Sequence, residues 1–237
     1  MHKYFLFDLD GTLLPMDLKK FIEIYLQAFC RKFAHTVQIE PKTLVQGIRD
    51  GASAMGANDG GCLNRELLWR AMNQRCNKDM RRYEEDFDNF YRNEFVAAKA
   101  ATKENPYVKQ TVDLLKSDGC KLIVATNPIF PKAATYTRLR WAGLDPNDFD
   151  HITVYDNCSA SKPNLNYYYD ICSFCGITPE ESIVVGNDVD EDMCAAKLGF
   201  DTFLVTDCLI NRRGKSIERY KRGSFEDFYN WLIDSGY

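Results

Sequence analysis

The sequence predicts an α/β fold, in which a parallel sheet is covered by helices on both faces and an all-helical domain is inserted after the first strand. Short apolar runs alternate with helical periodicity over residues 106–232, which is typical of a parallel sheet. Residues 17–98 show helical periodicity and no convincing strand. With 237 residues, 45% of them apolar, the chain can bury a sizeable core.

The first strand ends in two carboxylates. The apolar run Phe5-Leu6-Phe7 stops at Asp8 and Asp10, and Gly11 follows. Side chains at i and i+2 of a strand point the same way, so the two carboxylates should lie side by side. Gly11 gives the chain freedom to turn. Paired carboxylates repel unless a cation or a proton lies between them, although a solvated strand end is the simpler interpretation of this stretch alone.

Four helices are expected next. The first spans residues 18–33 and is capped by Asp17, and the second begins after Pro41. The glycine-containing stretch 51–61 is predicted to be a loop, and loops of this length are often functional. The third and fourth helices begin near residues 67 and 83.

The rest of the chain supplies the sheet and its covering helices. The predicted domains are a core of residues 1–16 and 99–237 and a helical domain of residues 17–98. Further strands are expected at 121–125, 152–155, 182–185 and 202–205, and helices at 108–116, 131–142, 165–175, 191–198 and 225–232.

Polar side chains follow each of the first four predicted strands. Ligands of parallel α/β sheets bind at the carboxyl ends of the strands, so these side chains should meet at one edge. Taken singly, Thr126 could be an ordinary loop hydroxyl and Lys162 a surface lysine. Taken together, the set predicts a functional site. Its members are Asp8, Asp10, Thr126, Asn127, Lys162, Asp188 and Asp192.

These stretches together resemble the haloacid dehalogenase (HAD) superfamily, whose members are mostly phosphatases. Residues 7–13, Phe-Asp-Leu-Asp-Gly-Thr-Leu, look like its first motif, and Thr126 and Lys162 match the second and third. Asp188 and Asp192 match the acidic fourth motif, although this chain has Gly186-Asn187-Asp188 where many members have Gly-Asp. The resemblance covers the whole chain. It implies a Rossmann-like core, and the inserted helices resemble a mobile C1-type cap.

The resemblance implies a role for each residue. Asp8 would be the nucleophile that forms an aspartyl-phosphate, and Asp10 the general acid and then the general base. Thr126 and Lys162 would bind the phosphoryl group and offset its charge, and Asn127 could donate a further hydrogen bond.

A magnesium site is also implied. Mg²⁺ would be held by the carboxylates of Asp8 and Asp188 and the backbone carbonyl of Asp10, an all-oxygen set that suits this ion. Asp192 would support Asp188 or be an alternate ligand. Asp190 and Glu191 are expected to be exposed charges in the first turn of a helix.

The predicted function is a Mg²⁺-dependent phosphatase that hydrolyses a small phosphorylated metabolite. Asp10 favours phosphoryl transfer over dehalogenation, because halide leaves without a proton. A phosphomutase remains an alternative, as does a non-catalytic binding or regulatory protein on the same fold. The sequence leaves open which metabolite is the substrate.

Composition limits the partners and the location. A net charge of −4 argues against nucleic-acid binding, and the basic stretch 212–222 is expected to be a solvated loop. No apolar segment is long enough to span a membrane, and no N-terminal signal is expected, because Asp8 and Asp10 interrupt the first apolar run. Nine scattered cysteines suggest reduced thiols, so a cytoplasmic location is expected. Nothing in the sequence indicates an oligomeric state.

Overall fold

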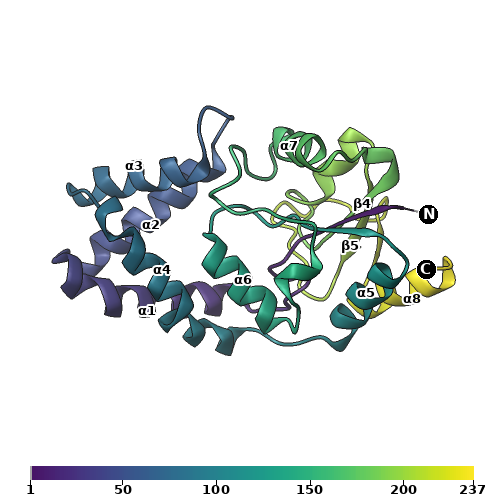
Figure 1. The fold of residues 1–237 in the computed structure, drawn as a ribbon, viewed down its shortest axis with the longest axis horizontal. Helices are drawn as coiled ribbons and strands as arrows, with labels where there is room; N and C mark the ends of the chain where they lie inside the picture. The colour runs from purple at the N-terminus through teal and green to yellow at the C-terminus, as the bar shows by residue number, and fades with distance from the viewer. Residues whose placement is uncertain (1) are drawn as a thin grey trace.

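The fold is built on one parallel sheet of six strands in the order β3-β2-β1-β4-β5-β6 (Figure 1). The computed structural model describes residues 2–237. Every pair of neighbouring strands is parallel, which confirms the predicted fold class. The strands are β1 (Tyr4–Phe7), β2 (Lys121–Val124), β3 (His151–Ile152), β4 (Ser182–Gly186), β5 (Asp201–Val205) and β6 (Lys221–Gly223).

The alternation of side chains along β1 directs them to two separate layers of helices. Phe5 and Phe7 join the apolar cluster that contains α5 and α8, whereas Leu6 joins the cluster under α7 and η5. Figure 1 shows α5 and α8 on one side of the sheet and α7 on the other. These helices are α5 (Pro106–Ser117), α6 (Lys132–Trp141), η3 (Pro146–Asp148), α7 (Leu165–Cys175), η4 (Pro179–Glu181), η5 (Met193–Leu198) and α8 (Phe225–Asp234).

Between Leu18 and Ala101 the chain forms helices and no strand. The segment leaves and re-enters the core at one place, because the Asp17 amide donates to the Ala101 carbonyl at 2.9 Å and Met16 pairs with Thr102. Its helices lie beside the sheet in Figure 1. They are α1 (Leu18–Val37), α2 (Pro41–Gly56), α3 (Asn64–Cys76), η1 (Arg81–Tyr83), α4 (Glu84–Arg92) and η2 (Glu94–Ala101).

The predicted loop at 51–61 is wrong over its first half, since α2 continues to Gly56. Its glycines allow α2 and α3 to pack closely. A Cβ added at Gly51 would lie 2.4 Å from Leu68 Cδ1, and one at Gly47 would lie 2.8 Å from Met72 Sδ. These glycines therefore serve helix packing, and the loop itself is shorter, at residues 57–63.

Two further elements differ from the prediction. The third strand ends at Ile152 instead of Tyr155, because the Asn157 side chain binds the Val154 amide and the Ile152 carbonyl. The charged strand β6 was not predicted; it pairs only with β5, at the edge of the sheet. Within residues 2–237, no helix combines the length and apolarity needed to cross a membrane.

Candidate active site

Strand pairing brings the predicted site residues to one edge of the sheet. The strands β2, β1 and β4 are neighbours, and Thr126, Asp8 and Asp188 each lie within two residues of the carboxyl end of their strand. The Asp8 amide continues the ladder by donating to the Val185 carbonyl at 2.9 Å. Gly11 turns the chain with a φ of +92°, and a Cβ there would lie 2.3 Å from Asn187 Nδ2. Glycine is therefore required both by the turn and by the contact.

Lys162 joins two of the predicted carboxylates. Its ammonium donates to Asp8 Oδ1 at 2.9 Å and to Asp192 Oδ1 at 2.6 Å. All three side chains are buried. Burial opposes the charged form of Lys162, but attraction to Asp192 and Asp8 raises the pKa of this lysine well above its ordinary value. The alternative of a surface lysine is excluded by its 3% exposure.

Both oxygens of Asp192 are engaged. The second oxygen, Oδ2, accepts from the Asp188 amide at 2.9 Å, so Asp192 connects Lys162 to the loop after β4. Burial raises the pKa of Asp192 to about 7, an effect that Lys162 opposes. A Cβ at Gly186 would lie 2.2 Å from the Asp192 carboxylate, so this packing needs glycine. The geometry favours a positioning role for Asp192.

Asp10 has a partner that sequence reasoning missed, the Arg138 guanidinium from α6. Nη1 of Arg138 donates to Asp10 Oδ2, and within residues 2–237 the buried Asp10 Oδ1 has no hydrogen-bond partner. Burial raises the pKa of Asp10, and Arg138 opposes that rise. Arg138 is fully buried, lying 4.4 Å from the centroid of the Phe130 ring. Its spacing of four residues from Ala134, on the apolar face of α6, was the signal that could have identified it.

Thr126 and Asn127 are fixed by different contacts. Thr126 is buried, and its carbonyl accepts hydrogen bonds from Thr153 Oγ1 at 2.7 Å and the Tyr167 hydroxyl at 2.9 Å. Asn127 donates its side-chain amide to Glu191 Oε2 at 3.0 Å, and its own buried Oδ1 has no hydrogen-bond partner among the residues that the structure describes. The structure thus places Asn127 against the loop after β4.

The basic stretch near the C-terminus is largely an exposed loop, as predicted, but its ion pairs with the site were not predicted. Its Arg212 pairs with Asp188 Oδ2, and Lys215 pairs with Asp190. Ile210 also joins this loop to the site, because it accepts from the Val189 amide at 3.0 Å and donates to the Asn187 carbonyl at 2.9 Å. Asp190 is therefore paired and only 17% exposed at its side chain, not a free surface charge as expected.

Glu191 is likewise less exposed than predicted. Its side chain is 28% exposed and accepts the hydrogen bond from Asn127. Burial raises the pKa of Glu191. The helix expected to start at this residue begins instead at Met193, as the short 3-10 helix η5.

The inserted helices reach the site through Asn64, which is fully buried at the start of α3. Its side-chain amide donates to the Pro128 carbonyl and to Ser161 Oγ, each at 3.0 Å. The side-chain oxygen of Asn64 is also bound, because the Asn58 side-chain amide donates to Asn64 Oδ1 at 2.7 Å. Asn64 thus joins the helical segment to the loops that carry Thr126 and Lys162.

The four carboxylates of Asp8, Asp10, Asp188 and Asp192 are oxygen donors, the kind of ligand that Mg²⁺ prefers. If all four were ionised, they would exceed the three cations paired with them, Lys162, Arg138 and Arg212, by one negative charge. Within residues 2–237 no three acidic side chains are already grouped as a metal site. Asp188 Oδ1 accepts from the Asp190 and Glu191 amides, while Oδ2 pairs, among the described residues, with Arg212 alone, whose side chain is 54% exposed.

Comparisons with known proteins show the family of this chain. A family model described as haloacid dehalogenase-like hydrolase matches residues 2–199. The chain belongs to this family. Its membership confirms the predicted resemblance and the prediction of an enzyme of the hydrolase class.

The individual relatives have low sequence identity to this chain. A glyceraldehyde 3-phosphate phosphatase from Methanothermobacter thermautotrophicus is 30% identical over 115 residues, which is 48% of this chain and 50% of that protein. The match thus spans about half the length of the relative. Among solved structures, a HAD phosphatase from Thermococcus onnurineus has a TM-score of 0.60 at 20% identity, over 97% of both chains. The HAD-hydrolase YfnB from Bacillus subtilis, bound to magnesium, has a TM-score of 0.59 at 19% identity, and the match covers 98% of this chain and 99% of that chain.

Proposed function

We propose that the chain is a Mg²⁺-dependent phosphatase that hydrolyses a small phosphorylated metabolite through an aspartyl-phosphate on Asp8. The observation that carries the proposal is the pair of aspartates with different partners: Asp8 is held by Lys162, and Asp10 is held by Arg138 with one oxygen free. The glyceraldehyde 3-phosphate phosphatase relative supports a phosphorylated substrate of similar small size.

In the first step the Asp8 carboxylate attacks phosphorus, and the bond from phosphorus to the ester oxygen breaks. Lys162 already contacts Asp8 and offsets the negative charge that accumulates as the two anions meet. Asp10 gives its proton to the leaving oxygen. Burial raises the pKa of Asp10, which favours the protonated form that this step needs.

In the second step water cleaves the aspartyl-phosphate. Asp10, now ionised, removes a proton from that water, and phosphate leaves with the Asp8 carboxylate restored. Arg138 keeps one Asp10 oxygen fixed, so the free oxygen exchanges the proton in both steps. Thr126 would donate its hydroxyl to the phosphoryl group from the neighbouring strand end.

Mg²⁺ would be held by the carboxylates of Asp8 and Asp188 and the carbonyl of Asp10, and it would supply charge neutralisation for the phosphoryl group. Asp192, with both oxygens engaged, keeps the loop after β4 in place. The helical segment would select the leaving group, since Asn64 contacts both loops that approach the phosphate.

The test is hydrolysis of an aryl phosphate and of a metabolite panel that includes glyceraldehyde 3-phosphate, measured with Mg²⁺, with EDTA and with Asp8→Asn. Asp201→Asn is the matched control, because that aspartate is exposed and pairs with His2. We expect activity that EDTA and Asp8→Asn both abolish and Asp201→Asn keeps. Full activity of Asp8→Asn, or inactivity of the folded, Mg²⁺-loaded protein on the whole panel, would overturn the proposal.

A further inference from the structure

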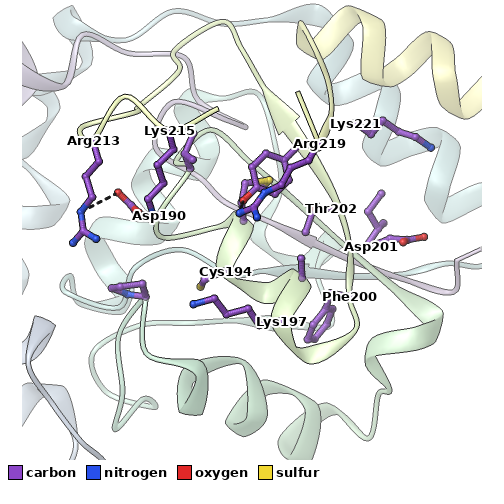
Figure 2. Close-up of a pocket in the computed structure, with 16 residues that line it drawn as sticks. Asp190, Cys194, Lys197, Phe200, Asp201, Thr202, Arg213, Lys215, Arg219 and Lys221 are labelled. Carbon is purple, nitrogen blue, oxygen red and sulfur yellow. Dashed lines mark hydrogen bonds and ion pairs between the residues drawn. The ribbon is translucent and has the colours of Figure 1, made fainter. Parts of the chain in front are cut away.

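A pocket lies next to the loop that follows β4 (Figure 2). Its volume is about 680 Å³, within the range of small-molecule sites. It lies between η5 and the segment 213–221, and its lining includes none of the seven predicted site residues. The pocket is therefore distinct from the candidate active site, although Asp190 in its wall belongs to the same loop as Asp188.

The lining of this pocket is strongly cationic. Lys197 comes from η5, and Lys215 and Arg219 come from the facing segment, as Figure 2 shows. Arg213 lies at the rim, where it faces Asp190 and its side chain is 74% exposed. The one carboxylate between them, Asp190, pairs with Lys215 and with Arg213. With Lys221 and Asp201, which also line the pocket, the lining holds five cations and two carboxylates in a protein whose net charge is −4.

Two of these cations have no carboxylate to neutralise them. Within the part of the chain that the structure describes, Lys197 makes no salt bridge, and Arg219 only donates to the Tyr220 hydroxyl and stacks on the same ring at 4.7 Å. Lys221 and Asp201, the first residues of β6 and β5, lie at the far end of the pocket (Figure 2). Buried apolar side chains, among them Met193 and Phe200, close the floor.

We propose that this pocket binds a small anion of the phosphate type that carries at least two negative charges, such as a diphosphate, free or as part of a nucleotide. The excess of three positive charges matches such an anion. The two guanidinium groups offer the paired donors that suit phosphate oxygens, and the lysines add point charges. The concave shape and limited volume favour a small molecule over an acidic protein segment.

The first experiment measures binding of inorganic diphosphate and of ADP by calorimetry, at fixed ionic strength and with EDTA present. The test variant is Lys197→Ala/Arg219→Ala. The control is Lys109→Ala/Lys116→Ala, which removes the same charge from α5 on the other face of the sheet. We expect binding that weakens about tenfold or more in the test variant, weakens with added salt and is nearly unchanged in the control.

The two probes separate the two sources of the anion. Tighter binding of ADP would identify a nucleotide, and binding of diphosphate alone would identify the free anion; both support the site. No binding of either probe at millimolar concentration, or equal binding by wild type and test variant, would overturn the proposal. Because the substituted side chains are exposed, the variants should fold, which a thermal melt checks.

A second variant tests the sign of the charge effect. Asp190→Asn frees Lys215 and Arg213, so the anion should bind several-fold more tightly. Asp113→Asn, which frees the exposed Lys109 of α5, is the matched control and should change nothing. Weaker or unchanged binding in Asp190→Asn would show that these two cations do not reach the anion and would contradict the proposed site.

Discussion

At the carboxyl edge of the sheet the large buried side chains are charged, whereas between Leu18 and Ala101 they are aromatic. Asp8, Lys162 and Arg138 are held by ion pairs with almost no exposure. In the helical segment, rings pack directly on one another, with centroids as close as 4.6 Å for Phe33 and Phe87. Other rings in this cluster are Tyr25, Phe29, Phe90, Tyr91 and Phe95.

The two kinds of interior depend on different interactions. Desolvation destabilises a buried charge unless an opposite charge is paired with it. Each buried charge at the carboxyl edge therefore depends on its partners. The aromatic cluster is stabilised by the burial of apolar surface and by close packing. Small changes there should lower the free energy of unfolding in proportion to the volume and surface lost. Substitutions at the edge should therefore lower activity and stability together, and those among the helices should lower stability alone.

The largest effect is expected for Lys162→Met. This substitution leaves Asp8 and Asp192 buried without their common cation, so the free energy of unfolding should fall by about 3 kcal/mol. Hydrolysis should fall roughly 10²- to 10³-fold, because the charge that offsets the phosphoryl group is lost. Urea unfolding and steady-state kinetics measure the two effects.

Lys121→Met is the control for this change, because Lys121 pairs with Asp150 at 2.8 Å on the surface. Exposed pairs of this kind contribute little, so both measurements should match wild type within error. A Lys162→Met protein as stable as wild type would show that the buried cluster adjusts by protonation, and the proposed difference between the two interiors would not hold.

A smaller effect, on stability alone, is expected for Gly51→Val in α2. Its Cβ would meet Leu68 Cδ1 at 2.4 Å, so overpacking should lower the free energy of unfolding by about 1–3 kcal/mol. The rate of aryl phosphate hydrolysis at saturation should stay within about twofold, because no contact of Asp8 or Lys162 changes. Gly56→Val in the same helix is the control, since a Cβ there meets nothing within 4 Å.

Arg138→Met should change the pH dependence of the reaction. Arg138 opposes the rise that burial produces in the pKa of Asp10, so its removal should raise that pKa further. Since the first step needs protonated Asp10, activity falls as the pH rises through this pKa. The alkaline fall of kcat/KM should therefore move to higher pH in the variant.

The matched control is Arg140→Met, an exposed arginine of the same helix, whose pH profile should follow wild type. Arg138→Lys keeps the charge and should give an intermediate profile. If the alkaline limb of Arg138→Met stays in place, Arg138 fixes the geometry of Asp10 without affecting its proton.

Much of the fold could be predicted because strand and helix leave periodic patterns, and the site residues follow the strands directly in sequence. The pattern at Phe5-Leu6-Phe7 and the polar residues after it depend only on local order along the chain. Glycine occurs both in loops and at close helix contacts, and the sequence does not distinguish the two. Gly51 was interpreted as part of a loop, but it lies in α2 and allows close contact with Leu68 of α3.

The partners of the site residues could not be predicted in the same way. Arg138 meets Asp10 across 128 residues, and Arg212 meets Asp188 across 24, so no local pattern joins them. A charged residue in a helix or loop is most often solvated, so neither arginine was expected to contact the site. The charged strand β6 was missed for the same reason.

The smallest expected effect concerns Arg212, the exposed cation on Asp188. If Asp188 holds Mg²⁺ as proposed, Arg212 competes for Oδ2, and Arg212→Ala should tighten Mg²⁺ binding by roughly two- to fivefold, a modest change because exposed charges are screened. Calorimetric titration of Mg²⁺ measures it. Arg213→Ala, which removes the same charge beside Asp190, is the control and should have a smaller effect. Weaker Mg²⁺ binding in Arg212→Ala would contradict this competition. It would mean that Arg212 holds the loop after β4 in the geometry that binds the metal.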